Sequence, residues 1–270
     1  MLKNKKWLIV PFSIILAAIL IISGCGSSSD SITEAGSTTV QPVLELIADK
    51  YMGEYPDVNI VVQGGGSSAG VKSVSEGTVD IGAASRELKS SEQGLGLVEH
   101  VLAKDGIAIA AHPSQSISGL TAEQVVAIFS GEITNWSEVG GADEAIHVVA
   151  REEGSGTRDA FEELVMGDAL IIDGATLLPS NAAVRTAVSN DPDAIGFLSM
   201  GYVTGDVKAL DIDGVAATIE NARNGSYPVV RPLLLLTKGE PEGVVKEFID
   251  YCLSSEGQDV VADEGYIRID

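Results

Sequence analysis

IHVVAREEGSGTRDAF, residues 146–161, places a β-branched strand and Arg151 directly before a Gly-Ser-Gly-Thr turn and a helix with one apolar side. Gly36-Ser37-Thr38-Thr39 and Gly64-Gly65-Gly66-Ser67-Ser68 are two earlier turns of the same kind, and each also precedes a helical pattern. The start of a helix offers unpaired N–H groups and a positive dipole end, and Gly and Ser/Thr add close approach and hydroxyl donors. One such turn is an ordinary helix cap, but three with an arginine predict a cage for a small oxyanion.

The rest of the chain predicts an α/β fold in which strands and helices alternate. Apolar residues at helical spacing predict helices over 40–54, with Thr38 or Thr39 as the cap, and over 69–76, 120–129 and 242–253, followed by a short tail. Apolar or β-branched runs predict strands over 59–63, 80–84, 106–111, 146–150, 194–198 and 229–237. This alternation favours a mostly parallel sheet with helices on both faces, and ligands bind beyond the carboxyl ends of such strands. We therefore expect the three turns to face one another across a cleft between two lobes.

The N-terminus has the features of an export signal. Lysines at positions 3, 5 and 6 precede an apolar run from Trp7 to Ile22, and Ile22-Ser23-Gly24-Cys25 then resembles a lipobox. We expect residues 1–24 to be a signal peptide, and residues 25–33 to be a lipidated Cys25 with a flexible tether. An uncleaved membrane anchor is the alternative. Either way the protein is expected to be extracytoplasmic, on the outer face of the cell membrane.

The charge balance limits the classes of partner. The chain has 17 Lys and Arg against 39 Asp and Glu, a net charge of −22; without residues 1–24 the basic count falls to 14 and the net charge is −25. Nucleic acids and anionic lipid headgroups require a basic surface, so we expect no nucleic-acid partner and membrane contact through the anchor only. A small anion can still bind in a shielded, dipole-lined pocket.

An ordered set of segments carries a resemblance to a known family over essentially the whole chain after the signal. The segments are GSTTVQP (36–42), GGGSSAGVKSVSEGTVDIGAASREL (64–88), IFSGEITNW (128–136), REEGSGTRDAF (151–161) and AIGFLSMGY (194–202). In them the chain resembles the phosphate-binding lipoproteins that feed ABC-type phosphate importers. The resemblance implies the type II periplasmic-binding-protein fold, with a ligand cleft between two α/β lobes. It also implies inorganic phosphate and importer permease subunits as partners, no cofactor, and a monomer. Within that fold we expect one lobe over 34–110 and 230–270 and the other over 111–229.

The resemblance also implies a set of ligand-binding residues. They are Thr38 and Thr39 of the first turn, Ser67 of the second, and Arg151, Ser155, Gly156 and Thr157 at the third. Glu153 and Arg158 are expected to pair with or orient Arg151.

One position departs from the family pattern. Well-studied members place an Asp after the DIGAS-like strand, where it accepts the proton of bound phosphate, whereas this chain has Ser85 followed by Arg86. Both join the candidate ligand residues, and for Arg86 a structural ion pair is an equal alternative. The carboxylate that would repel an unprotonated anion is missing, so sulfate or molybdate stays open as the ligand.

Enzymatic functions find little support in the sequence. GGSSAGVKS (65–73) lacks the Gly-Lys-Ser/Thr core of a P-loop, because Val71 separates Gly70 from Lys72. There is no G-x-S-x-G elbow, Ser155 has no evident His base, and the three histidines have no metal-site spacing. We expect a binding protein without metal or catalysis. A secreted phosphatase, and a phosphate sensor or surface protein of the same fold, are the alternatives.

Overall fold

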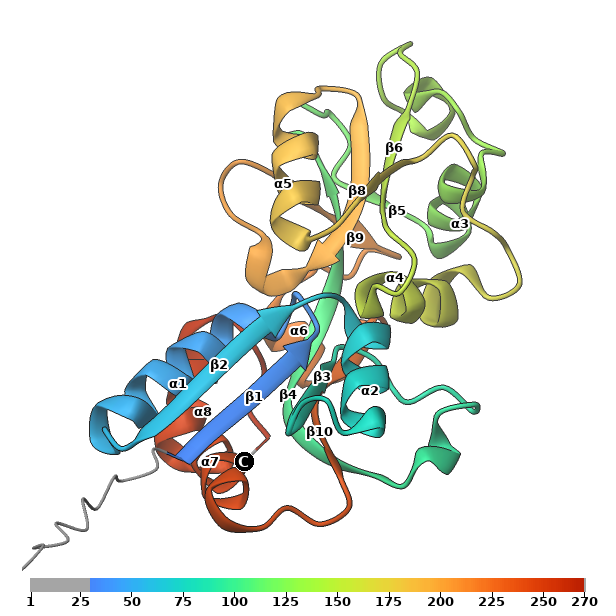
Figure 1. Cartoon of the computed structure of the whole chain (residues 1–270). Helices are drawn as coiled ribbons and strands as arrows, with labels where there is room; N and C mark the ends of the chain where they lie inside the picture. The colour runs from blue at the N-terminus through green and yellow to red at the C-terminus, as the bar shows by residue number, and fades with distance from the viewer. Residues whose placement is uncertain (1–29, 270) are drawn as a thin grey trace, which may run out of the picture.

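One long strand, β4 (Leu97–Ala111), runs through both halves of the molecule (Figure 1). The structure, a computed structural model, describes residues 30–269, so the predicted signal peptide and Cys25 lie outside the described residues. Up to Gly106, β4 pairs with β10 (Val230–Lys238), and from Ile107 onward it pairs with β8 (Ala194–Ser199). The strands follow the order β2-β1-β3-β10-β4-β8-β6-β7, and β9 also pairs with β4. We call the half before this change of partner lobe 1 and the half after it lobe 2.

Lobe 1 is a sheet with helices on both faces. Its elements are β1 (Asp30–Gly36), α1 (Gln41–Glu54), β2 (Val58–Gly64), α2 (Ser67–Glu76), β3 (Ile81–Ala84), η1 (Gln93–Leu95), β10, α7 (Gly243–Leu253) and α8 (Ser255–Asp263). Apolar side chains of α1, α7 and α8 pack on one face of the sheet, and those of α2 pack on the other.

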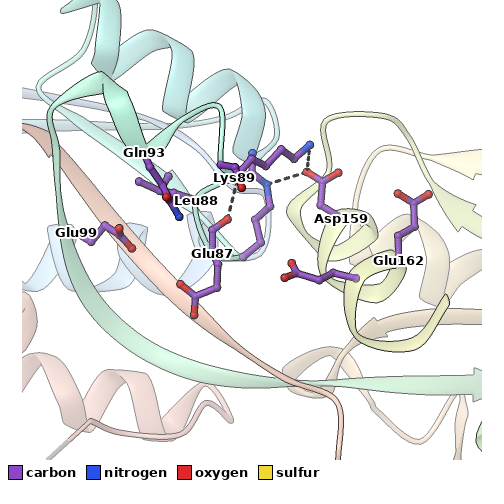
Figure 2. A pocket seen from close by; sticks show the side chains of 10 residues that line it. Glu87, Leu88, Lys89, Gln93, Glu99, Asp159 and Glu162 are labelled. Carbon is purple, nitrogen blue, oxygen red and sulfur yellow. Dashed lines mark hydrogen bonds and ion pairs between the residues drawn. The ribbon is translucent and has the colours of Figure 1, made fainter. Parts of the chain in front are cut away.

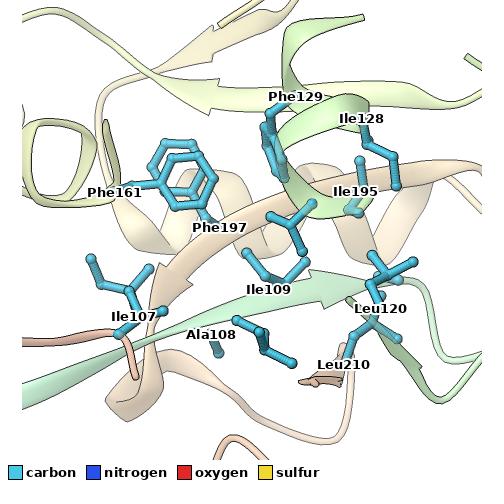
Figure 3. Close-up of a cluster of buried hydrophobic side chains, with 14 of the residues drawn as sticks. Ile107, Ala108, Ile109, Leu120, Ile128, Phe129, Phe161, Ile195, Phe197 and Leu210 are labelled. Carbon is cyan, nitrogen blue, oxygen red and sulfur yellow. The ribbon is translucent and has the colours of Figure 1, made fainter. Parts of the chain in front are cut away.

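Lobe 2 repeats this layered arrangement. Its elements are β5 (Gly119–Leu120), α3 (Ala122–Ser130), η2 (Trp136–Val139), β6 (His147–Arg151), α4 (Gly156–Phe161), η3 (Glu162–Met166), β7 (Thr176–Leu178), α5 (Asn181–Asn190), β8, η4 (Met200–Tyr202), β9 (Lys208–Ile212) and α6 (Ile219–Arg223). Figure 3 shows Phe129, Phe161 and Phe197 together in its core, where the rings of Phe161 and Phe197 stack with centroids 4.1 Å apart. The expected two-lobed α/β fold is confirmed. The boundaries 34–110, 111–229 and 230–270 stay a prediction, and we place the change of strand partner slightly earlier, at Gly106.

Three local expectations are wrong. The sheet is mixed rather than mostly parallel, because β10 runs antiparallel to β3 and β4, and β4 runs antiparallel to β8. The predicted tether is too long, since residues 30–33 already pair with β2, and Ile32 is fully buried. The C-terminal tail contains α8, which packs on α7 and completes the core of lobe 1.

The cap of α1 differs from the expectation in a way that affects the first turn. The Ser37 hydroxyl, and not that of Thr38 or Thr39, accepts from the backbone N–H groups of Thr39 and Val40, at 3.2 and 3.3 Å. Ser37 therefore takes the capping role. The hydroxyls of Thr38 and Thr39 are left for contacts with the other lobe.

Glu34 is a buried acid in β1, two residues before the first turn. Its side chain is 1% exposed, and one carboxyl oxygen has no hydrogen-bond partner. Burial raises the pKa of Glu34 to about 8. The folded protein therefore holds a proton there that the unfolded chain has lost, and its stability falls as the pH rises from about 4.5 to 8.

We predict that Glu34→Gln removes this pH dependence of the unfolding free energy, because the amide has the same shape and no charge to bury. The gain in unfolding free energy over wild type grows between pH 5 and pH 9 and reaches at most about 4 kcal/mol. Urea denaturation at pH 5, 7 and 9 measures it, with Glu76→Gln on the exposed end of α2 as the control. Parallel stability curves for Glu34→Gln and wild type would contradict the buried proton.

Candidate anion-binding site

The three turns meet between the lobes, each at the carboxyl end of a strand. The first follows β1, the second follows β2 and the third follows β6. Across the interface, the Ser68 N–H donates to the Gly154 carbonyl at 3.2 Å, and the Thr39 and Thr157 hydroxyls lie 3.2 Å apart. The sequence-based expectation that these turns face each other is therefore realised in the structure.

Close approach at the third turn depends on Gly156. A Cβ built there would overlap the Ser67 hydroxyl and lie 2.7 Å from that of Ser85. The Ser85 N–H donates to the Ser67 hydroxyl at 3.0 Å, which holds the two serines of lobe 1 together against Gly156 of lobe 2. Ser155 caps α4, since its hydroxyl accepts from the Arg158 N–H at 3.3 Å.

Arg151 is a buried cation without a carboxylate partner among the described residues. Its side chain is 2% exposed and donates to the Thr38 hydroxyl at 3.0 Å, to the carbonyls of Leu178 and Pro179, and to the Asn181 side chain. Burial and the nearby Arg231 guanidinium lower the pKa of Arg151 to about 10. A positive charge held in this way favours a bound anion.

The expectation that Glu153 pairs with Arg151 is wrong, whereas Arg158 does contact Arg151, through the Arg151 backbone carbonyl. Glu153 is exposed at the mouth of the site and forms no ion pair with Arg151. Arg158 pairs with Glu162 at 2.8 Å and donates to the Arg151 backbone carbonyl at 3.1 Å. Backbone carbonyls and Asn181 therefore orient Arg151, and the sequence offers no pattern that identifies such partners.

Arg231 of β10, which the sequence-based expectations did not include, is a further buried arginine beside this site. Its guanidinium pairs with Asp105 of β4 at 2.7 Å, and both side chains are at most 2% exposed. The same guanidinium donates to the Thr157 hydroxyl at 2.8 Å and to the carbonyl and hydroxyl oxygens of Ser85 at 2.9 and 3.3 Å. A signal was present, because Asp105 directly precedes the predicted strand 106–111 and Arg231 lies inside the predicted strand 229–237. A charge at or in a buried strand needs a partner.

Asn181, at the start of α5, was also missed. It is fully buried and donates to the Thr39 hydroxyl at 2.9 Å, which links lobe 2 to lobe 1. Within lobe 1, the Tyr266 hydroxyl donates to the Thr39 carbonyl at 3.0 Å. Nothing in the local pattern distinguishes Asn181 from an ordinary first-turn residue.

Of the two alternatives for Arg86 the ion pair is the one observed, and its one contact with a hydroxyl of the three turns is with Ser68. Its guanidinium donates to Asp159 at 2.8 Å and to both carboxyl oxygens of Glu92 at 2.7 and 2.9 Å. Asp159 also pairs with Lys89. Figure 2 shows Asp159 of lobe 2 facing Lys89 of lobe 1, and the Lys89 Nζ lies 3.0 Å from the Asp159 Oδ2. The remaining hydrogen bonds of Arg86 go to the Glu87 carbonyl and the Ser68 hydroxyl, so no donor of Arg86 is left for a ligand.

Cavities lined by residues of both lobes lie along the interface, and two of them in the described part of the chain differ in charge. The larger, about 610 Å³, is lined by Arg86 and Lys89 but also by five acids: Glu87, Glu99, Asp159, Glu162 and Glu163. The smaller, about 240 Å³, is lined by residues of the second and third turns with Thr38 and Arg151. Two acids, Glu152 and Glu153, also line the second cavity, but both are exposed, and Arg151 there has no carboxylate partner among the described residues. The second cavity is therefore the candidate site. Among residues 30–269, no group of three His, Cys, Asp or Glu side chains is arranged to hold a metal ion.

Comparisons with known proteins agree with this fold. The PBP superfamily domain matches residues 23–256. The phosphate-binding protein PstS of Bacillus subtilis is 37% identical over 100% of this chain and 95% of its own length. The chain belongs to the PstS phosphate-binding protein family. A phosphate-binding protein PstS of Borreliella burgdorferi is 28% identical, and the match covers 98% of this chain and 99% of the length of that protein.

Two solved structures share the fold over nearly their whole length. A Clostridium perfringens structure, described as a phosphate ABC transporter substrate-binding protein with bound phosphate, has 43% identity and a TM-score of 0.86, and the match covers 89% of this chain and 100% of that one. An ABC-type phosphate transport receptor from Vibrio cholerae has 37% identity and a TM-score of 0.76, with 87% and 99% covered.

We predict that Asp105→Ala strongly destabilises the protein. It leaves the Arg231 guanidinium buried without a counter-charge, and breaking a buried pair in this way costs about 3–5 kcal/mol. Chemical denaturation measures the loss. Asp250→Ala, which breaks the exposed Lys246–Asp250 pair, is the control and is expected to cost less than about 0.5 kcal/mol. Equal losses in the two variants would contradict the importance of the buried pair.

Proposed function

We propose that this protein captures inorganic phosphate outside the cytoplasm and delivers it to the permease subunits of an ABC importer, without catalysis. One observation carries the proposal: Thr39 of lobe 1 and Thr157 of lobe 2 lie 3.2 Å apart, and the neighbouring Thr38 accepts from Arg151, a buried cation with no carboxylate partner among residues 30–269. An oxyanion there would touch both lobes and supply the missing negative charge. The family membership supports the same conclusion.

The electrostatics of the site are consistent with a divalent anion. Arg231 is neutralised by Asp105, so Arg151 contributes one full positive charge. The N-terminal ends of α1, α2 and α4 each add roughly half a positive charge. Micromolar binding needs about 8 kcal/mol, and charge-assisted hydrogen bonds of about 1.5–3 kcal/mol each supply it after the costs of association.

The side chains around the site give no support to a hydrolase. The Ser155 hydroxyl caps α4, and the three histidines bond elsewhere, with Thr237, Ser114 and Asp191. No nucleophile–base pair is therefore formed at the third turn. A phosphate sensor or surface protein of the same fold is the second candidate, and phosphate uptake that survives deletion of the protein would favour it.

The location follows from the N-terminal pattern. We propose that Cys25 carries lipid after removal of residues 1–24 and anchors the protein on the outer face of the membrane. Within residues 30–269, no helix meets the length and hydropathy needed to cross a bilayer. Mass spectrometry of the membrane-bound protein tests the lipid on Cys25.

We predict that Arg151→Ala and Thr157→Ala each weaken phosphate binding at least tenfold. Each removes a donor from the site, and a tenfold loss corresponds to about 1.4 kcal/mol. Titration calorimetry measures affinity, and circular dichroism checks that the fold is kept. Arg185→Ala, which removes an equal charge from a surface pair, is the control and binds phosphate as wild type does. Unchanged affinity in both site variants would contradict the assignment.

We also predict that Gly156→Ala weakens phosphate binding at least tenfold by keeping the lobes apart. Its methyl group would occupy the space of the Ser67 hydroxyl in the other lobe. Small-angle scattering with saturating phosphate measures closure, and the variant is expected to stay more extended than wild type. Gly174→Ala, in open space, is the matched control. Wild-type affinity in Gly156→Ala would show that this contact is not part of the bound state.

A further inference from the structure

Two ion pairs between described residues join the lobes, and both use one oxygen of Asp159. Asp159 lies in α4 of lobe 2, and its Oδ2 is 2.8 Å from the Arg86 Nε and 3.0 Å from the Lys89 Nζ, both of lobe 1. The Arg86 side chain is 1% exposed and that of Asp159 is 15% exposed, whereas Lys89 is half-exposed. A pair shielded from solvent is screened less by salt and contributes more than a surface pair. The pair of Asp159 with Arg86 is therefore the stronger of the two links between the lobes.

Lobe 1 holds the Arg86 guanidinium in place for this contact. Its Nη1 and Nη2 atoms donate to the two carboxyl oxygens of Glu92 at 2.7 and 2.9 Å, and also to the Glu87 carbonyl and the Ser68 hydroxyl. All of these acceptors belong to lobe 1, and the Nε donor is the one directed to lobe 2. Arg86 therefore keeps Glu92 as its counter-charge when the lobes separate, and the pair with Asp159 can break and form again.

Both partners of this pair are hydrogen-bonded to turns that line the smaller cavity. The Asp159 N–H donates to the carbonyl of Ser155 in the third turn, at 2.9 Å. Arg86 donates to the hydroxyl of Ser68 in the second turn, at 3.3 Å, and the Ser68 N–H donates to the Gly154 carbonyl across the interface. Gly154 and Ser155 both line the smaller cavity. A movement of α4 that separates Asp159 from Arg86 therefore also displaces the third turn from the second.

Acidic side chains of the two lobes face each other across the larger cavity, beside this pair. They are Glu87 and Glu99 of lobe 1, and Glu162 and Glu163 of lobe 2. Figure 2 shows Glu87 and Glu99 on one side of the cavity and Asp159 and Glu162 on the other. Carboxylates on opposite walls repel each other, and the repulsion decreases as the walls move apart. The contacts of Asp159 with Arg86 and Lys89 therefore oppose a repulsion that favours separated lobes.

We propose that Asp159, with Arg86 and Lys89, forms a latch between the lobes that sets how long the protein retains bound phosphate. The proposal rests on the proposed function and concerns the control of release. Phosphate enters while the lobes are apart, and the two ion pairs form as the lobes close. Loss of the latch therefore speeds release without slowing entry. Asp159 does not line the smaller cavity, so it is a positioning residue that acts through α4 on the third turn.

Release of radiolabelled phosphate into an excess of unlabelled phosphate tests the proposal. We expect Asp159→Asn to raise the rate constant of release at least about tenfold, because two charge-assisted contacts are lost. Calorimetry gives the dissociation constant, and with the release rate it gives the rate constant of entry, which is expected to stay near the wild-type value. Glu163→Gln is the matched control, since it removes an equal charge from the same cavity without breaking an ion pair in the described part of the chain, and it is expected to release phosphate as wild type does.

Lys89→Met removes the half-exposed contact alone and tests the latch without touching a buried group. It is expected to speed release less than Asp159→Asn does, and to have no further effect when combined with Asp159→Asn, because the partner of Lys89 is then already lost. Wild-type release in Asp159→Asn overturns the latch and leaves phosphate capture intact. Slower entry in that variant, in place of faster release, also overturns it. Absence of phosphate binding in the wild-type protein overturns the proposed function itself.

Discussion

The uncompensated burial of Arg151 is the constraint on which the site depends. Three buried guanidinium groups lie between the lobes, and among the described residues Arg86 and Arg231 have carboxylate partners whereas Arg151 has none. Burial, and then the charge of Arg231, lower the pKa of Arg151 to about 10, and its desolvated charge is costly unless an anion approaches. Under the proposed function, binding and closure are coupled, because an anion that compensates Arg151 of lobe 2 would also bond hydroxyls of lobe 1.

The sheet connects the two lobes and places these charged groups between them. β4 passes from one half to the other without interruption, and β10 brings Arg231 to the point where β4 changes partner. The three turns sit at strand ends that face this crossing. Polar contacts, rather than apolar packing, join the lobes at the site, including the Arg86–Asp159 pair and the Ser68–Gly154 backbone bond. Such contacts are directional and allow the lobes to separate and close again.

Much of the fold could be predicted from the sequence, because periodic apolar runs such as 40–54 and 106–111 pack in the structure much as their patterns indicate. The three turns were found for the same reason, since their chemistry is local. Arg231, Asp105 and Asn181 were missed because their roles come from tertiary contacts between residues up to 192 positions apart. The same limit explains Arg86 and Glu153: a charge next to a motif does not show which partner it meets in space.

The most direct test of the central claim is a crystal structure of the protein with phosphate. The account predicts one tetrahedral anion whose oxygens lie about 3 Å from the Arg151 guanidinium and from the hydroxyls of both Thr39 and Thr157. An anion held by one lobe alone, or in the acid-lined cavity beside Lys89, would contradict it.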